Sequence, residues 1–258
     1  MSLDSTRTLL FGMFVLAGRK LTATEVIELA KPLSISATNV KSHLTRMVED
    51  GALRRSGPVR RAQYWPSGSQ KMVVDAILQR LHGNHLEPWD GRWIMLTVRM
   101  PAVRGKKERL KTELWFDGFR PYAPGVFVRP GWPKDWALSR AQFHLAQAPG
   151  LCICGLPIPP IEINDISAMY GLDLLDREAR RLGCRIANSN VSTLTAAEAF
   201  ATRIKIGGLV ARFIGHDPRL PMALWGGRTG MRDLIRVFHR FEVRIAPISQ
   251  RFLDTVIH

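Results

Sequence analysis

Residues Thr22–Pro66, TATEVIELAKPLSISATNVKSHLTRMVEDGALRRSGPVRRAQYWP, contain the signals for two short helices followed by a hairpin. Thr22 and Glu25 have the spacing of a capping box, in which a Thr side chain and a Glu side chain satisfy each other's free backbone N–H groups. We expect this first helix to end near Pro32, because the residue before a proline disfavours the helical conformation.

A second helix is predicted after the proline, with Ser34 or Ser36 as its N-cap. Gly51 is expected to end it, since glycine readily adopts the left-handed conformation that follows many helices. Its apolar residues recur at three- and four-residue spacing, as on one buried face: Val40, Leu44, Met47 and Val48. The polar residues between them are then left on the outer face.

Two short basic strands follow this helix. Ala52-Leu53-Arg54-Arg55 and Arg60-Arg61-Ala62-Gln63-Tyr64-Trp65 are separated by Ser-Gly-Pro, which is typical of a turn. With an apolar helix expected over residues 6–16, these elements predict a winged helix-turn-helix domain over residues 1–66. In such domains one helix enters the major groove of duplex DNA.

The outer helix face and the hairpin tip form a candidate DNA-binding surface. Asparagine can make two hydrogen bonds to adenine, and a threonine methyl group can contact thymine. Hairpin arginines suit phosphates or the minor groove. The alternative is an ordinary solvated surface. The predicted contacts are Ser36, Thr38, Asn39, Lys41, Ser42, Thr45 and Arg46 in the helix, and Arg54, Arg55, Arg60, Arg61 and Gln63 in the hairpin.

The whole chain is basic. It has 258 residues and a formal net charge of +15, divided as +6 over residues 1–82, +5 over residues 83–140 and +4 over residues 141–258. This length predicts about two or three domains. The charge favours a polyanion such as nucleic acid, or an anionic ligand such as an acyl-CoA. The alternative is a basic surface that only maintains solubility.

Several classes of protein are disfavoured. Cys152, Cys154 and Cys184 are too few for a disulfide framework, which fits a reducing cytoplasm. Neither a run of roughly 20 apolar residues nor a signal peptide is found. Phosphate-binding loops, nucleophile elbows and zinc-protease motifs are also missing. We therefore expect a cytoplasmic protein without a membrane span, catalytic residues, metal site or cofactor.

The remainder of the chain predicts an α+β multidomain organisation. A connector helix and linker are expected over residues 67–88, a small α+β domain over residues 89–160 and a helical domain over residues 161–258. Within them we expect strands at 94–98, 121–128 and 151–156 and helices at 106–116, 166–182, 195–214 and 231–241. Cys152 and Cys154 are expected to be small buried side chains of the third strand.

Three motifs occur in order after the hairpin: Trp89-Asp90-Gly91-Arg92-Trp93, then Gly118-Phe119 leading to Ala123–Pro130, and finally Asp217-Pro218-Arg219-Leu220-Pro221. With the basic winged helix, this order resembles the PaaX family of bacterial repressors. The chain departs from the family pattern after the last motif, where it continues Met222-Ala223-Leu224-Trp225-Gly226-Gly227.

The resemblance implies a winged helix-turn-helix domain, a ferredoxin-like central domain and a mostly helical C-terminal domain. It also implies a homodimer that represses an aromatic-catabolic operon from a palindromic operator. An aryl acyl-CoA, typically phenylacetyl-CoA, would release it. Such an effector needs cations and an apolar slot. The candidates are Trp89, Arg92, Trp93, Arg120 and Arg129, and the alternative is that the tryptophans only pack around a turn.

Three alternative functions would have other requirements. A metal sensor would need four ligands, and the Cys152-x-Cys154 spacing is not the usual one of a zinc site. A ferredoxin-like metal-dependent nuclease would place a carboxylate near the end of the first strand, where this chain has Val98-Arg99-Met100-Pro101. A non-specific DNA-binding protein would share the basic surface without reading bases.

Overall fold

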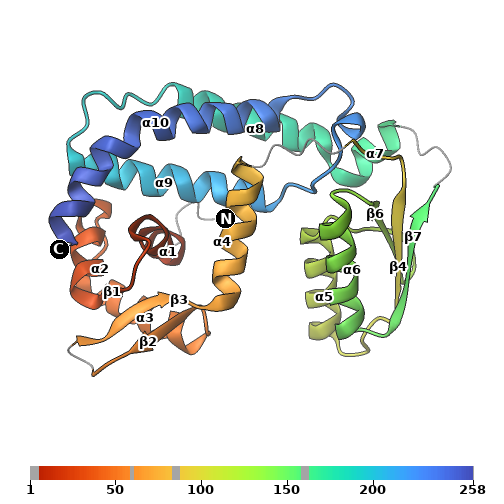
Figure 1. The fold of residues 1–258 in the computed structure, drawn as a ribbon, viewed down its shortest axis with the longest axis horizontal. Coiled ribbons are helices and arrows are strands. Elements are labelled where there is room, and N and C mark those ends of the chain that lie inside the picture. Colours follow the sequence, from red (N-terminus) through yellow and green to blue (C-terminus); the bar gives the residue numbers. More distant parts are fainter. Residues whose placement is uncertain (1–5, 59–60, 83–87, 158–162, 258) are drawn as a thin grey trace. The chain divides into compact units, whose positions relative to one another are not determined.

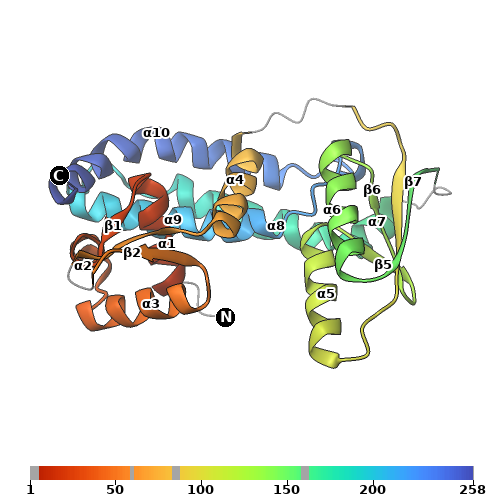
Figure 2. The ribbon, with the colours of Figure 1, turned by 60° about the horizontal axis from the view of Figure 1, so that its bottom comes forward.

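The computed structural model describes residues 6–58, 61–82, 88–157 and 163–257, which have a mixed α+β fold (Figures 1 and 2). The chain divides into two compact units. The first takes its described residues from 1–83, 182–214 and 234–258, and the second from 84–181 and 215–233. The region expected to be a helical C-terminal domain therefore contributes to both units. In the described part of the chain, no helix is long and apolar enough to cross a membrane.

The first unit begins with a helical bundle edged by a small sheet. The three strands are antiparallel in the order β1-β3-β2. The elements are α1 (Thr6–Ala17), β1 (Leu21–Thr22), α2 (Ala23–Ala30), a 3-10 helix (Lys31–Leu33), α3 (Ala37–Glu49), β2 (Leu53–Ser56), β3 (Gln63–Pro66) and α4 (Gly68–His82).

Local signals set the bounds of α2 and α3. The Thr22 hydroxyl accepts a hydrogen bond from the Glu25 N–H at 3.2 Å, and a Glu25 carboxylate oxygen accepts one from the Thr22 N–H at 2.6 Å. The predicted capping box is thus confirmed. Ser36, not Ser34, caps α3, because its hydroxyl accepts a hydrogen bond from the Asn39 N–H at 3.3 Å. Gly51 follows the helix at φ +69°.

The hydrophobic core of the first unit contains side chains from both the N-terminal and the C-terminal parts of the chain. Val40, Leu44 and Met47 of α3 are buried as predicted, and Val48 packs against them. The same core includes side chains of α9 (Ala196–Gly215) and α10 (Gly230–Val256): Phe200, Ala201, Ile204 and Leu253. An ion pair between Arg203 and Glu242, 2.8 Å long, ties α9 to α10.

The second unit contains a four-stranded antiparallel sheet in the order β5-β6-β4-β7. Helices α5 and α6 cover one of its faces (Figure 1). Their contact with the sheet buries Leu96, Phe127, Leu114 and Ala141. The elements are β4 (Trp93–Val98), α5 (Arg104–Phe116), β5 (Arg120–Ala123), β6 (Val126–Pro130), α6 (Lys134–Gln147), β7 (Gly150–Leu156) and α7 (Ile163–Tyr170). The unit also includes most of α8 (Leu172–Ala187) and a 3-10 helix, Met222–Trp225.

Some predicted elements are wrong. The single strand at 121–128 is a hairpin, since Gly125 at φ +74° turns the chain between β5 and β6. The single helix at 166–182 is divided into α7 and α8 at Gly171, whose φ is +64°. Helix α10 continues through Pro247 to Val256 rather than ending at Phe241, and α6 was not predicted.

Candidate nucleic-acid interface

Helix α3 presents the predicted polar face to solvent. Its predicted contacts are exposed, apart from half-buried Ser42: Ser36, Thr38, Asn39, Lys41, Thr45 and Arg46. The Ser36 hydroxyl is engaged as the cap, and the Thr45 hydroxyl donates to the Lys41 carbonyl at 3.1 Å. Across the described residues, the other exposed side chains in this set make no hydrogen bond or ion pair. They are therefore available to an external partner.

The charge of α3 also suits an anionic partner. Its sequence has no carboxylate before Glu49 at its last position. Its N-terminal N–H groups carry a partial positive charge, which attracts anions. The nearby carboxylate of Asp50 is paired with Arg7 at 2.6 Å. The exposed face is thus free of negative charge over its first three turns.

The hairpin places basic side chains next to α3. Arg54, Arg55, Arg61 and Gln63 are exposed, and their side chains have no hydrogen-bond or salt-bridge partner among the described residues. Arg60 lies outside the described residues. Arg54 pairs with Trp65 across the strands, so both side chains lie on the same face of the sheet.

Lys20 adds a cation that the sequence analysis missed. Its ammonium lies 4.3 Å from the centre of the Trp65 ring, a cation–π distance. Pairing of β1 with β3 brings Lys20, the residue before β1, beside Trp65. Sequence patterns could not predict this contact, because helices α2 and α3 lie between Lys20 and Trp65 in the sequence.

The Trp89–Trp93 segment forms a turn that is held by its own side chains. The Arg92 N–H donates to an Asp90 carboxylate oxygen at 3.0 Å, and the Trp89 indole N–H donates to the Arg92 carbonyl at 2.9 Å. The Trp89 and Trp93 rings meet edge to face, 6.0 Å between centres. Trp93 is buried and Arg92 is exposed. These contacts agree with the alternative that the two tryptophans pack around a turn and do not bind an effector.

Arg129, a candidate effector residue, is fully buried in the second unit. It donates through Nε to the Pro130 carbonyl at 3.0 Å, through Nη2 to the Trp132 carbonyl at 2.8 Å and through Nη1 to the Asp117 carbonyl. Its guanidinium also lies over the Trp136 ring. These contacts hold the loop after α5 to the end of β6.

Arg120 is also buried, with 3% of its surface exposed. Its Nη1 donates to the Trp115 and Phe119 carbonyls at 2.9 and 3.0 Å, and its guanidinium packs over the Trp115 and Tyr170 rings. Burial lowers the pKa of Arg120 to about 10. The structure thus keeps the two predicted effector arginines away from solvent.

A polar cluster lies close to these arginines. One carboxylate oxygen of Asp117 lies 2.8 Å from both Arg140 Nε and His144 Nε2. Burial alone would raise the pKa of Asp117, but the hydrogen bonds and charges of His144 and Arg140 outweigh it and leave the pKa below its ordinary value. The cluster links the end of α5 to α6.

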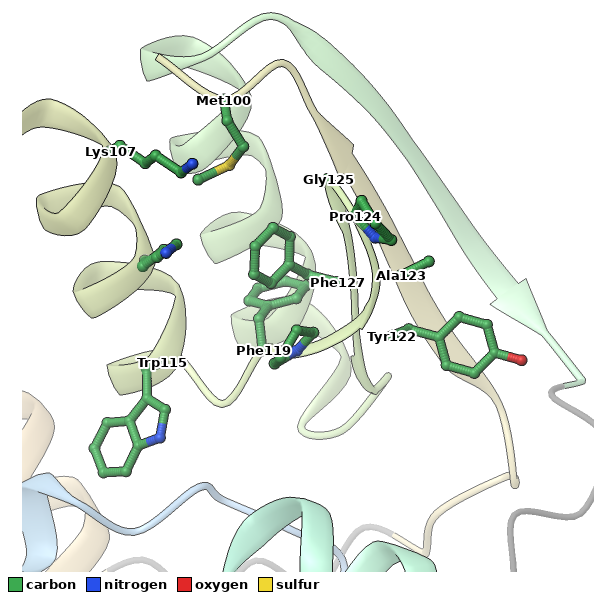
Figure 3. A pocket seen from close by; sticks show the side chains of 11 residues that line it. Met100, Lys107, Trp115, Phe119, Tyr122, Ala123, Pro124, Gly125 and Phe127 are labelled. Carbon is green, nitrogen blue, oxygen red and sulfur yellow. The ribbon is translucent and has the colours of Figure 1, made fainter. Parts of the chain in front are cut away.

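A pocket of about 650 Å³ lies in the second unit, between α5 and the β5–β6 hairpin. Trp115, Phe119 and Phe127 form much of its apolar wall (Figure 3). Lys107 and Lys111 of α5 also line it. Lys111 pairs with Glu108 at 3.1 Å, whereas the Lys107 ammonium has no partner in the described ranges and extends toward Met100 (Figure 3).

None of the predicted effector residues lines this pocket. Successive strand residues point to opposite faces, so Arg120 and Pro121 lie on different sides of the sheet, and only Pro121 lines the pocket. The pocket is not predictable from the sequence pattern, because its walls come from a helix and from a hairpin that the pattern predicts as a single strand.

The predicted position of a nuclease carboxylate holds cationic Arg99, which is exposed after β4. In the ranges that the structure describes, no group of three or more His, Cys, Asp and Glu residues could hold a metal ion.

No protein-family model and no curated protein matches the chain. Among solved structures, the chain is similar to the uncharacterized protein Rv0674 from Mycobacterium tuberculosis. The two share 21% sequence identity and a TM-score of 0.60, over 97% of this chain and 99% of that one. At this identity the likeness extends to the fold alone, so the resemblance to the PaaX family depends only on the motifs.

Proposed function

We propose that the protein binds duplex DNA through α3 and the β2–β3 hairpin and that it recognises a specific base sequence. One observation carries the proposal. The exposed Asn39, Lys41 and Arg46 side chains of α3 have no partner in the described part of the protein, and they adjoin the equally unpartnered arginines of the hairpin. Asparagine and arginine are side chains that read base edges, and arginine also contacts phosphates.

The arrangement of elements supports a winged helix-turn-helix assignment for residues 1–66. Helices α2 and α3 are joined by a short connection, and the antiparallel β2–β3 hairpin follows α3 directly. In this assignment α3 is the recognition helix and the hairpin is the wing. The element order β4-α5-β5-β6-α6-β7 and the strand order β5-β6-β4-β7 support a ferredoxin-like assignment for the central domain.

The proposed function extends to a PaaX-type repressor, on the strength of the motif resemblance. The protein would then bind a palindromic operator as a homodimer and leave it when an aryl acyl-CoA binds. The pocket beside α5 favours an effector of this kind. Its volume lies within the usual range for ligand sites, its wall is mainly apolar, and Lys107 and Lys111 supply positive charge.

The pocket is the proposed effector site in place of the buried arginines. An aromatic acyl group would lie against Trp115, Phe119 and Phe127, and the lysines would attract an anionic group. An effector acts only through a difference in its affinity for the DNA-bound and free states. Its addition should therefore weaken operator binding by the same factor by which DNA weakens effector binding.

Selection from a random duplex library tests sequence recognition. The selected duplex should compete for the protein at far lower concentration than random DNA at the same salt, since specific sites typically bind about 10³–10⁷ times more tightly. Equal competition by both duplexes would reject sequence recognition and leave a non-specific DNA-binding protein. An absence of binding to either duplex would reject the DNA interface altogether.

A further inference from the structure

Two cysteines lie side by side on strand β7, at the edge of the four-stranded sheet. The Sγ atoms of Cys152 and Cys154 are 3.4 Å apart, and both thiols are free. Cys154 is exposed, whereas Cys152 is half-buried and packs against the core of the unit. The expectation that both would be buried is therefore wrong for Cys154 and only partly met by Cys152.

We propose that Cys152 and Cys154 form a reversible dithiol–disulfide site, which peroxides oxidise and thiol reductants restore. The proposal is independent of DNA binding. It depends on three observations: the contact between the thiols, the exposure of Cys154 and the position of both residues on an edge strand.

The backbone geometry allows the bridge with a small movement. Residues two apart on a strand have Cα atoms about 6.6 Å apart, within the range of about 4.4–6.8 Å seen in disulfides. The Sγ atoms must close from 3.4 Å to a bond length of about 2.05 Å. Among the described residues only β4 pairs with β7, so the other side of the strand can move without breaking further sheet hydrogen bonds.

The end of β7 is already irregular, which makes this movement easier. Its pairing with β4 shifts register between Trp93 and Ile94, next to Cys154. Gly155 follows at φ +76°, a conformation that other residues rarely adopt. The separation still lies at the upper end of the disulfide range, so the bridge would be strained. Strain makes a disulfide easier to reduce, which fits the proposed reversibility.

The two thiols have different surroundings and therefore different roles. Cys154 is exposed and meets the oxidant. Burial raises the pKa of the Cys152 thiol to about 12, with a further contribution from the hydrogen bond and charge of Cys154. Cys152 thus keeps its proton near neutral pH and is the less reactive of the two thiols toward peroxide. Oxidation of Cys154 to a sulfenic acid removes the part of this rise in pKa that comes from the hydrogen bond and charge of Cys154, and leaves burial, its largest cause.

The reaction has two steps. The Cys154 thiolate attacks one oxygen of hydrogen peroxide, the O–O bond breaks and hydroxide leaves, which gives the sulfenic acid. Cys152 Sγ then attacks Cys154 Sγ, loses its proton and displaces hydroxide as the S–O bond breaks. Both hydroxides end as water, so one peroxide is reduced to two waters while two thiols become one disulfide.

Thiol counting and intact mass test the proposal. The full-length protein, reduced and freed of reductant, would be treated with hydrogen peroxide and then alkylated. We expect two of the three cysteines to resist alkylation, a mass lower by two hydrogen atoms, and full recovery of alkylation after dithiothreitol. Peptide mapping should show the bridge between Cys152 and Cys154 within one chain.

Two variants separate the proposed site from general oxidation. Cys184→Ser removes the third cysteine, which lies on α8, and should still form the bridge. Cys152→Ser should form none, and its Cys154 should accumulate as a sulfenic acid that dimedone traps. The proposal fails if three thiols survive peroxide in the folded protein, if oxidation occurs only at Cys184, or if the bridge joins two chains.

Discussion

Replacement of Arg54, Arg55 and Arg61 by alanine should weaken binding to all duplexes and reduce its dependence on salt. These arginines are exposed, and their side chains have no hydrogen-bond or ion-pair partner among the described residues. Their removal should therefore leave the stability of the fold almost unchanged, because surface substitutions away from specific interactions cost little. A loss of DNA affinity can then be attributed to the interface.

The size of the effect follows from counterion release. Each phosphate contact adds about 0.9 to the slope of log affinity against log salt, so three contacts contribute about 2.7. Between 50 and 200 mM salt, the wild type should therefore lose about 40-fold more affinity than the triple variant. Fluorescence anisotropy with one labelled duplex over this range of salt measures both slopes.

A charge-matched control distinguishes direct contact from the field of the whole protein. Arg232, Arg240 and Arg244 are exposed on α10, outside the proposed surface, and their replacement removes the same net charge. This control should change the slope far less than the hairpin variant does. Equal slopes for the wild type and the hairpin variant would refute the hairpin as a phosphate-binding element. If the hairpin variant and the α10 control lowered the slope by the same amount, the hairpin arginines would act only through the net charge of the protein.

Three further substitutions test other parts of the structure. Asn39→Ala should cost about 1–3 kcal/mol on the selected duplex and much less on random DNA, and equal losses in a binding titration would exclude base readout by Asn39. Lys107→Ala should weaken the binding of phenylacetyl-CoA, measured by calorimetry. The control is Lys106→Ala, which replaces an exposed lysine outside the pocket lining and should weaken binding less. Equal affinities of the two variants would show that Lys107 does not contact the ligand. Asp117→Asn should destabilise the protein at neutral pH by about 1–3 kcal/mol, because Arg140 and His144 lose a charged acceptor. Since the pKa of Asp117 is lowered, its contribution is present above the ordinary value of 3.8 and lost as the pH falls through the lowered pKa. The difference in chemical-denaturation stability between this variant and the wild type should accordingly narrow below pH 3.8, and a constant difference would contradict the role of the charge.

The sequence was most informative where structure depends on neighbouring residues. The Thr22–Glu25 capping box and the Ser36 cap each join residues three apart in the sequence, so both can be recognised from residue types and spacing alone. The apolar face of α3 is equally local, because a helix places residues three and four apart on one side. These features were enough to predict which polar residues of α3 are exposed, except for Ser42, which is half-buried.

Helix α6 shows where pattern analysis fails. The residues that it buries are Ala137, Ala141 and His144. Two alanines and a histidine make the buried face hardly more hydrophobic than the exposed face, on which Leu138 and Phe143 are accessible to solvent. The buried face depends on the close fit of α6 to the sheet and on the Asp117–His144 contact, and both require the tertiary fold.

The buried arginines are a second example. In the sequence, Arg120 and Arg129 are cations in or next to a motif that resembles one of the PaaX family, which favours a role in binding an anion. In the structure, their donors are occupied largely by main-chain carbonyls, and their planar faces lie on aromatic rings. No spacing rule separates these two uses of arginine, because the carbonyls that accept the hydrogen bonds become neighbours only after folding.

The shared core of the first unit changes how its N-terminal part should be understood. The N-terminal helices do not form an independent module, because α1, α2 and α3 share one hydrophobic core with Phe200, Ile204 and Leu253 from α9 and α10. Gly208 brings α9 so close to α1 that a Cβ atom on it would lie 3.3 Å from the Thr8 methyl group. A loss of packing at Phe200 or Leu253 therefore also disturbs the helix that carries Asn39. If the proposed DNA surface is correct, substitutions at Phe200 or Leu253 should therefore weaken DNA binding although neither residue belongs to that surface.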